Sequence, residues 1–338
     1  MSPFNKTLLA IAISALPLQA FACASCGCSV NSDWGAQGVS TGQGWSIDMR
    51  YDYLNQDQLR AGHGTISADA ARATINNQGD PAEVEKFTKN QYTTATLDYN
   101  NGASWGLSLQ LPYIHRTHST YGQATIDASG NIVGGYPAMD GGYDSSASGL
   151  GDIKLIGRYF GLLPSKNLGL QMGLKLATGK KDQVASSDNT IAVDPGLQLG
   201  TGTTDLVLGV YWFDNLDADW DSFAQASYQT ALDHSTMAAG SYKPGDGFNL
   251  NLGVRYHGID ALIPTLQINS RFVSHDTGPA ADTYATGGTL VYLTPGLIVP
   301  VGHKTSLYAS VQVPVYQNVR GIQLTPKYIF SAGMHASF

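Results

Sequence analysis

The sequence has few charged residues and no long apolar run beyond its first two dozen positions. Only 13% of the 338 residues are Asp, Glu, Lys or Arg, about half the share of an average soluble domain. A helical membrane protein would need apolar stretches of about 20 residues, and none follows residue 22. Mean hydropathy is −0.11. This combination excludes an ordinary soluble globule and a helical membrane protein, but fits strands that alternate an apolar face with a polar one.

Cysteine is also scarce, and its three copies are clustered at Cys23, Cys26 and Cys28. The residues before them, with Lys6, a short apolar stretch and an A-x-A site at 20–22, predict an export signal at 1–22. A periplasmic cysteine-containing segment at 23–43 comes next. Thiols usually pair in an oxidising compartment, and an odd number leaves one over. Three interpretations stay open: binding of a soft metal such as Zn²⁺ or Cu(I), a disulfide beside a lipidated Cys23, or oxidation with no role.

Signals for other functions are weak. The net charge of −7 is spread without acidic or basic blocks, so nucleic-acid binding is not expected. No H-E-x-x-H helix and no CxxCH haem motif occurs, so we expect neither an enzyme nor a cofactor. A barrel hydrolase could still assemble a serine and a histidine from separate strands, and Ser274 and His257 are the candidates for that arrangement.

From residue 44 onward the dominant hydrophobic period is two. Trp45, Ile47, Met49, Tyr51 and Tyr53 alternate with Ser46, Asp48, Arg50 and Asp52, which places apolar groups on one face of a strand. Similar stretches predict about twelve strands, at 44–54, 90–100, 103–115, 149–160, 167–178, 202–213, 220–231, 246–258, 264–275, 288–300, 304–316 and 324–338.

The connections between these stretches alternate in length. Short turns are expected at 100–102, 161–166, 214–219, 259–263 and 301–303. Long loops are expected at 55–89, 116–148, 179–201, 232–245 and 276–287, with helical turns at 67–75 and 81–89 in the first. Short turns on one side and long loops on the other are typical of transmembrane barrels. The sequence therefore predicts an all-β, antiparallel transmembrane barrel over 44–338, with short periplasmic turns and long extracellular loops.

The last strand supports an outer-membrane location. Tyr328, Phe330 and Phe338 lie on one face of it, and a terminal aromatic residue after such alternation is the signal that barrel-assembly machinery recognises. The expected partners are therefore this machinery, outer-membrane lipid and a small-molecule solute.

If the aromatic face contacts lipid, the charged residues of the strands face the lumen, because a Lys or Arg at mid-membrane costs about 2–4 kcal/mol on the lipid side. Two interpretations are open: ion pairs across the lumen that stiffen the barrel, or a mildly cationic conduit that selects solutes. The expected lumen-lining residues are Asp48, Arg50, Asp52, Asp152, Lys154, Arg158, Lys175, Arg255, Arg271 and Lys327, with Asp205, Asp221 and His257 on the same face.

Three segments carry a resemblance to a known family: GLGDIKLIGRYF from Gly149 to Phe160, KLATGK from Lys175 to Lys180, and the terminal strand pair from Val313 to Phe338. Together they resemble the outer-membrane barrels grouped as transporters of the meta-pathway of phenol degradation, which lie near the fatty-acid-transporter-like channels. The resemblance implies uptake of aromatic or other hydrophobic compounds. The sequence departs from the family at Ala177, where the family has proline, and in its cysteine segment.

The leading hypothesis is therefore an outer-membrane channel for passive uptake of small, aromatic or hydrophobic molecules. The alternative is a barrel scaffold that docks a periplasmic redox or metal-handling partner through Cys23, Cys26 and Cys28. A structural barrel with a plugged lumen is the third possibility.

Overall fold

The computed structural model describes residues 42–75, 81–133 and 140–338, and these fold almost entirely into antiparallel strands. Strands hold 64% of these described residues and helices 3%. No helix in these ranges is long and apolar enough to cross a membrane. The expected export signal at 1–22 and the three cysteines lie outside the described residues, so they stay predictions.

Eleven strands form a closed wall in the order β16, β15, β14, β13, β10, β9, β8, β7, β4, β3 and β1, and β16 closes the sheet by pairing with β1. Each pairing around the wall is antiparallel. The expected antiparallel barrel is confirmed. The bounds are β1 Gly44–Gly62, β3 Glu83–Asn100, β4 Trp105–Gln123, β7 Lys154–Tyr159, β8 Leu168–Lys175, β9 Asp205–Asn215, β10 Trp220–Ala231, β13 Gly247–Tyr256, β14 Ile263–Val273, β15 Gly288–Pro300 and β16 Thr305–Ser337.

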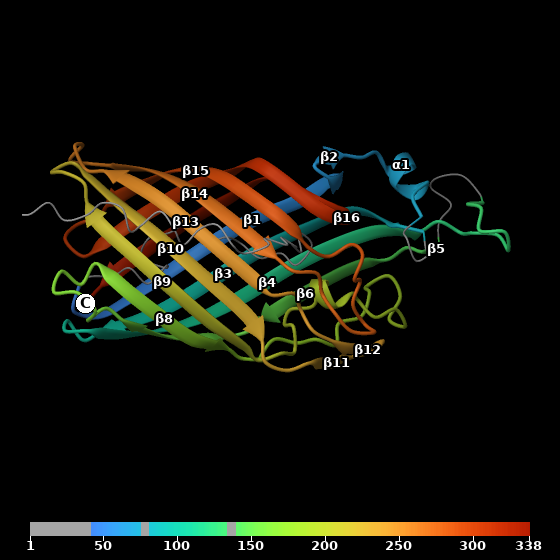
Figure 1. Cartoon of the computed structure of the whole chain (residues 1–338), viewed down its shortest axis with the longest axis horizontal. Coiled ribbons are helices and arrows are strands. Elements are labelled where there is room, and N and C mark those ends of the chain that lie inside the picture. The colour runs from blue at the N-terminus through green and yellow to red at the C-terminus, as the bar shows by residue number, and fades with distance from the viewer. Residues whose placement is uncertain (1–41, 76–80, 134–139) are drawn as a thin grey trace, which may run out of the picture.

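β16 crosses the membrane twice. Residues 306–319 pair with β15, whereas residues 322–337 pair with β1. Gly321, at φ +63°, lies at the reversal, and Gln317 Nε2 donates to Pro326 O between the two arms at 3.1 Å. The described wall therefore makes twelve passes, as expected. Its first and last passes start and end at the same end of the barrel (Figure 1).

The connections are sorted by length between the two ends. At one end, five short turns join neighbouring wall strands. The other end carries the long connections and the remaining elements (Figure 1), which are β2 Gly64–Thr65, α1 Ala68–Arg72, β5 Asp140–Gly141, β6 Asp144–Leu150, the 3₁₀ turn η1 Pro195–Leu197, β11 Ser235–Met237 and β12 Gly240–Tyr242. This sorting agrees with periplasmic turns at the first end and extracellular loops at the second.

The first long connection is shorter than expected because β1 and β3 continue past the membrane span. The helical turn expected at 67–75 is present as α1, where Ser67 Oγ caps the helix by accepting from Ala70 N at 3.2 Å. The second expected turn, at 81–89, is wrong. Residues 83–89 belong to β3, because their backbone groups find partners on β4, where Phe87 pairs with Ser119.

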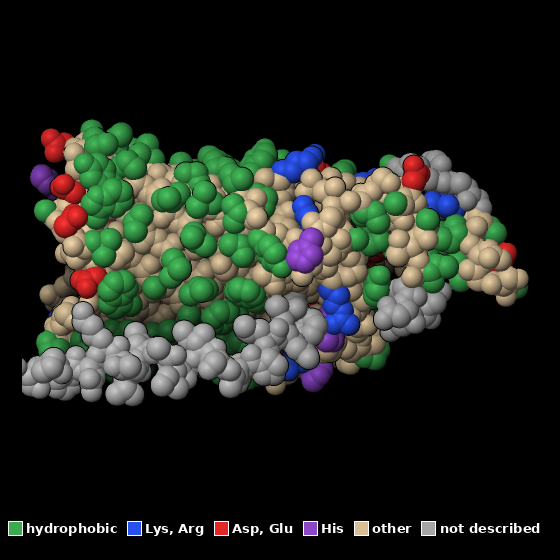
Figure 2. Space-filling view, turned by 45° about the horizontal axis from the view of Figure 1, so that its top comes forward, with side chains coloured by type: hydrophobic (Ala, Val, Ile, Leu, Met, Phe, Trp, Pro, Cys, Tyr) green, Lys and Arg blue, Asp and Glu red, His purple; other side chains and the backbone are tan. Residues whose placement is uncertain are grey.

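The outer face carries an apolar belt bounded by aromatic rings. Near the short turns, the ring centroids of Trp45 and Tyr99 lie 4.9 Å apart and those of Tyr99 and Trp105 lie 5.5 Å apart. Trp45 is 47% exposed, whereas its neighbour Ser46 is 5% exposed. Figure 2 shows the belt in green, ending where Lys, Arg and His side chains gather toward the long connections. Aromatic girdles mark the two membrane interfaces of such barrels, so the belt marks the membrane span.

Aromatic side chains fill the lumen near the short turns. Phe160, Tyr211 and Phe223 form a buried cluster there. Glycines on the inward face make room for them: a Cβ on Gly169 would lie 2.2 Å from the Tyr211 ring, and one on Gly253 would lie 2.3 Å from the Phe223 ring. At this end these aromatic rings therefore narrow the lumen.

A pair of substitutions on β4 tests where the membrane lies. Leu109 and Thr117 share the outward face of β4, but only Leu109 lies between the aromatic rings of Trp105 and Tyr113. Leu109→Arg should lower the free energy of unfolding by about 2–4 kcal/mol, whereas Thr117→Arg should change it little. Guanidinium unfolding of the barrel in lipid vesicles measures both. Equal effects at the two positions would contradict the assigned membrane span.

Candidate functional site

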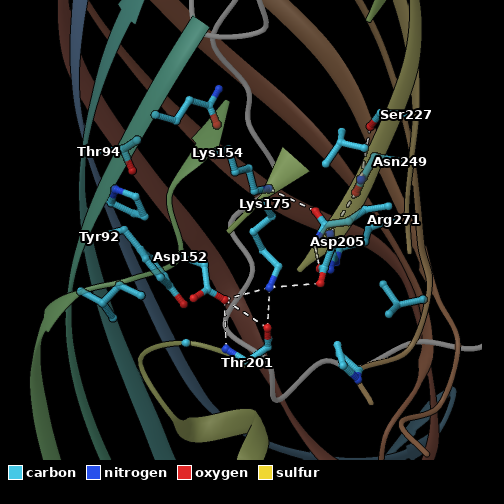
Figure 3. A pocket seen from close by; sticks show the side chains of 18 of the residues that line it. Tyr92, Thr94, Asp152, Lys154, Lys175, Thr201, Asp205, Ser227, Asn249 and Arg271 are labelled. Carbon is cyan, nitrogen blue, oxygen red and sulfur yellow. Dashed lines mark hydrogen bonds and ion pairs between the residues drawn. The ribbon is translucent and has the colours of Figure 1, made fainter. Parts of the chain in front are cut away.

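A cavity of about 360 Å³ lies in the middle of the lumen. Its walls are the inward faces of β3, β4, β7 to β10, β13 and β14, and residues 195–201 of the β8–β9 connection cover it toward the long loops. In Figure 3, Tyr92 and Thr94 lie on one side, and Ser227, Asn249 and Arg271 lie on the other. The cavity is therefore enclosed by the wall and by a connection that folds into the barrel.

One carboxylate links the wall to this connection. Asp152 Oδ2 accepts from Lys175 Nζ at 2.8 Å and from Thr201 N at 3.0 Å, while Oδ1 accepts from Gly179 N at 3.0 Å. Lys175 Nζ also lies 3.2 Å from Asp205 Oδ1. We call Asp152, Lys175, Thr201, Asp205 and the Gly179 backbone the Asp152 network; its polar side chains meet at the centre of Figure 3.

The glycines around Asp152 let the backbone bend and come close to the Asp152 carboxylate. The strand expected at 149–160 is interrupted at residues 151–153, which separate β6 from β7. The wall is joined here by one backbone hydrogen bond, from Leu176 N to Ile153 O at 2.8 Å, and by a side chain: Thr178 Oγ1 accepts from Ile153 N at 2.9 Å and donates to Gly151 O at 3.0 Å. A Cβ on Gly200 would lie 2.5 Å from Asp152 Oδ1. Two of the three segments behind the family resemblance, 149–160 and 175–180, thus meet at one structural joint.

Arg116 holds the covering connection from the opposite side. Its Nη1 donates to Gln198 O at 2.9 Å and to Gly196 O at 3.2 Å, its Nη2 donates to Tyr92 Oη at 3.0 Å, and its Nε donates to Asn90 Oδ1. All four acceptors are neutral. Beside it, Leu199 packs with Tyr92 and Ile114 in a buried apolar cluster. The connection is thus fixed by polar contacts at both of its sides and by apolar contact between them.

Amide side chains form a hydrogen-bonded row around one side of the lumen. Asn269 donates to Asn251 at 3.0 Å, Asn251 donates to Gln225 at 3.3 Å, and Gln225 donates to Gln171 at 3.1 Å. Thr294 joins the row by donating to Asn269 at 2.6 Å. Buried polar groups are costly unless hydrogen-bonded, so this row lets a narrow lumen stay polar without charge.

Carboxylates gather beyond the membrane span, at the mouth of the barrel. Burial, with the nearby charge of Asp194, raises the pKa of Glu85 from 4.5 to about 8. The pKa of Glu83 is raised well above its usual value by the same causes, and that of Asp194 is raised by burial and by Asp282. His118 Nδ1 lies 3.9 Å from Glu85, but burial and Arg116 lower its pKa to about 4. At neutral pH this contact therefore joins two uncharged groups.

The expected lumen-lining residues divide into three groups. Arg50, Asp152, Lys154, Arg158, Lys175, Asp205 and Arg271 line the cavity. Asp48 and Asp52 lie below it, where Asp52 pairs with Arg50 at 2.8 Å and Asp48 accepts from Tyr308 at 3.0 Å. Arg255, Asp221 and His257 form a separate group at the short-turn end, where Arg255 Nη2 lies 2.7 Å from Asp221 Oδ2.

Lys327 is the exception. Its side chain is 59% exposed and lies 3.2 Å from Asp57, another surface residue, so the expectation that it lines the lumen is wrong. The cause is a β-bulge in the β1–β16 pairing between Leu54 and Gln58, because an extra residue on one strand reverses which face the following residues occupy.

The assembly-signal residues Tyr328, Phe330 and Phe338 lie on the outer face and are 48%, 37% and 64% exposed. Their role stays a prediction.

Sequence reasoning missed Arg116 and the covering residues 195–201. The alternating pattern predicted a strand that ends at residue 115, one position before Arg116, whereas β4 continues to Gln123. No pattern in residues 179–201 shows that the connection turns inward. The unusual density of glycine and threonine at 200–204 is the one signal that could have marked a close backbone approach.

The residues considered for catalysis or metal binding do not assemble into a site. His257 follows the short-turn end of β13, whereas Ser274 follows the opposite end of β14. The pentapeptide GASWG at 102–106 has the spacing of a hydrolase nucleophile elbow, but it forms a turn between two strands, not a strand-to-helix turn. Within the described residues, no group of three or more His, Cys, Asp or Glu side chains could hold a metal ion.

No family model and no curated protein matches the chain, but solved structures do. An outer-membrane channel from Pseudomonas putida F1 is 13% identical, has a TM-score of 0.60 and covers 88% of this chain and 96% of its own. The CymD monoaromatic hydrocarbon channel is 11% identical, with 96% and 99% covered and a TM-score of 0.46. The toluene transporter TbuX of Ralstonia pickettii is 10% identical, with 88% and 90% covered and a TM-score of 0.43.

The likeness to the Pseudomonas putida channel, together with the closed wall and its apolar belt, decides the fold. The chain is an outer-membrane β-barrel. The resemblance to fatty-acid-transporter-like barrels is thereby confirmed for the fold. Docking of a redox partner through the cysteine segment has no support from the comparisons.

The Asp152 network predicts a large cost for losing its cation. Lys175→Met leaves Asp152 and Asp205 buried without a positive partner, and breaking such a pair costs about 3–5 kcal/mol. We expect that loss in guanidinium unfolding of the barrel in vesicles. Lys327→Met, which removes an exposed ion pair, should cost about 0–1 kcal/mol. A Lys175→Met barrel as stable as the Lys327→Met control would show that the network does not hold the fold.

The carboxylates at the mouth predict a pH-dependent opening of the covering connection. A raised pKa means that the folded arrangement favours the protonated acid, so its stability is fully present below about pH 4.5 and is lost as pH rises through about 8. Backbone amides of residues 185–200 should therefore exchange hydrogen faster at pH 8.5 than at pH 5, after correction for intrinsic exchange.

Glu85→Gln should reduce this pH dependence, because the amide does not ionise. Asp127→Asn, in an exposed turn elsewhere, should leave it intact. Unchanged protection of 185–200 across this pH range in the unmodified protein would contradict the assignment.

Proposed function

We propose that this barrel is a passive channel through which small molecules, including aromatic or hydrophobic ones, cross the outer membrane. The observation that carries the proposal is the enclosed cavity of about 360 Å³ in the lumen. Cavities of about 300–1,000 Å³ are the size that holds small ligands. A twelve-pass barrel is narrower than the open porins of 16–18 strands, which favours specific small solutes over bulk diffusion.

The lining of the cavity supports solutes with an apolar part. Tyr92, Ile114 and Leu199 present a continuous apolar patch under the covering connection. Ile156 and Val207 extend the apolar lining onto β7 and β9. Polar side chains occupy the rest of the wall, so a solute with one apolar and one polar side matches both surfaces.

Narrowing the cavity tests the channel. Ser227 and Tyr228 are neighbours on β10 that point to opposite faces: Ser227 lines the cavity, and Tyr228 is 39% exposed on the outer face. Ser227→Trp should reduce single-channel conductance and the swelling rate of proteoliposomes in a pentose solution by about half or more, since an indole fills a large part of a cavity of this size.

Tyr228→Trp is the matched control and should leave both rates unchanged, because the added atoms face lipid. Heat-modifiable migration on denaturing gels verifies that both variants form barrels. If Ser227→Trp conducts and swells like the unmodified protein, solutes do not pass through this cavity.

A further inference from the structure

The lining of the cavity carries more positive than negative charge. Six cationic side chains and three carboxylates face it. Two of the carboxylates, Asp152 and Asp205, are bound to the single cation Lys175. The third, Asp276, accepts hydrogen bonds from Tyr242 Oη at 2.9 Å and from Gly245 N at 2.8 Å. These three carboxylates therefore do not pair with the remaining cations of the lining.

Arg271 is the cation with donors left over. It stands on the inward face of β14, and its Nη1 donates to Asn249 Oδ1 at 3.1 Å. Its Nε is buried without a hydrogen-bond partner among the described residues, and within the same ranges it forms no ion pair. A guanidinium has five N–H donors in a planar fork that matches a carboxylate. Arg271 is partly buried, and a partly desolvated guanidinium binds an anion more strongly than one in water does, so a ligand that supplies a carboxylate is stabilised here.

The opposite wall brings a second positive charge toward the same space. Lys154 extends from β7, and its Nζ donates to Gln229 Oε1 at 3.2 Å. Figure 3 shows Lys154 between the side of the cavity that carries Tyr92 and Thr94 and the side that carries Arg271. Arg116, by contrast, already uses its donors on Tyr92, Asn90 and the covering connection. Arg271, assisted by Lys154, is thus the position in the lining where an anionic ligand would bind.

We infer that the solute of this channel is a small organic anion, an aromatic carboxylate of about one ring, whose carboxylate binds the Arg271 fork. This inference rests on the proposed channel function and names its solute class. Val273 follows Arg271 on the same face of β14, so the ring meets an apolar surface next to the charge. A neutral hydrocarbon would leave the Arg271 donors unpaired, and a cation would be repelled.

Titration calorimetry on the purified barrel in detergent tests this solute class without depending on conduction. The probes are benzoate, benzyl alcohol, benzylammonium and acetate. Benzoate should bind at least about tenfold more tightly than benzyl alcohol or acetate, since a charge-assisted bidentate contact and ring burial each add about that factor. Benzylammonium should give no binding heat. Arg271→Gln should weaken benzoate at least about tenfold and leave benzyl alcohol unchanged.

Two further variants keep the test sharp. Lys327→Gln removes an exposed cation outside the lumen and should leave benzoate affinity unchanged. Arg271→Lys keeps the charge but loses the fork, and should bind benzoate with an affinity between those of the unmodified protein and Arg271→Gln. Equal affinity for benzoate and benzyl alcohol, or an unchanged benzoate affinity in Arg271→Gln, would overturn the inference.

The outcome is separable from that of the channel proposal. If Ser227→Trp reduces flux but the barrel binds benzoate no better than benzyl alcohol, the solute class is rejected and the channel proposal stands. If benzoate binding depends on Arg271 but Ser227→Trp does not change the flux, the anion site is supported and passage through the cavity is rejected.

Discussion

The structure depends on one constraint: in the hydrocarbon layer, each backbone N–H and C=O group must find its partner within the protein, because each one left unsatisfied costs several kcal/mol. The pairing of β16 with β1 meets this constraint by removing both edges of the sheet. Closure after twelve passes leaves a narrow interior, and the strand period of two sends the polar half of each strand into it. The polar, crowded lumen is therefore a consequence of closure and not an independent feature.

A crowded polar lumen must satisfy its own groups, and the barrel does so in layers. Near the short turns, aromatic rings packed against glycines fill much of the space. Above them, the amide row from Asn269 to Gln171 satisfies polar groups without net charge. The Asp152 network then neutralises one lysine with two carboxylates. At the cavity, a positive group of the described wall, Arg271, keeps donors unused. The lining can therefore bind an anion at Arg271, the position where no carboxylate of the described wall neutralises the positive charge.

A strict period of two along the sequence predicted the membrane-spanning strands, and it predicted little else. The strands at 220–231 and 288–300 have their expected bounds, because alternation runs unbroken through them. The errors lie where the period breaks. A bulge turned Lys327 outward, glycines interrupted the strand expected at 149–160, and strands that leave the membrane, such as β4, carried Arg116 beyond the expected span. The covering residues 195–201 could not be predicted, because their inward position depends on partners in distant strands, Asp152 and Arg116.

The same constraint also determines which part of the barrel can move. A wall strand cannot leave its neighbours without exposing backbone groups to lipid, whereas a connection beyond the membrane exchanges protein partners for water at little cost. Residues 196–201 are fixed to the wall by Asp152 and Arg116. The outer part of the same connection is held by Asp194, which accepts from Tyr143 Oη at 2.9 Å among other buried acids. Repulsion among these acids grows as they ionise, and it opposes the packing of this outer part. Motion that admits a solute therefore belongs to residues 185–195, while the charged surface that recognises it stays on the rigid wall below.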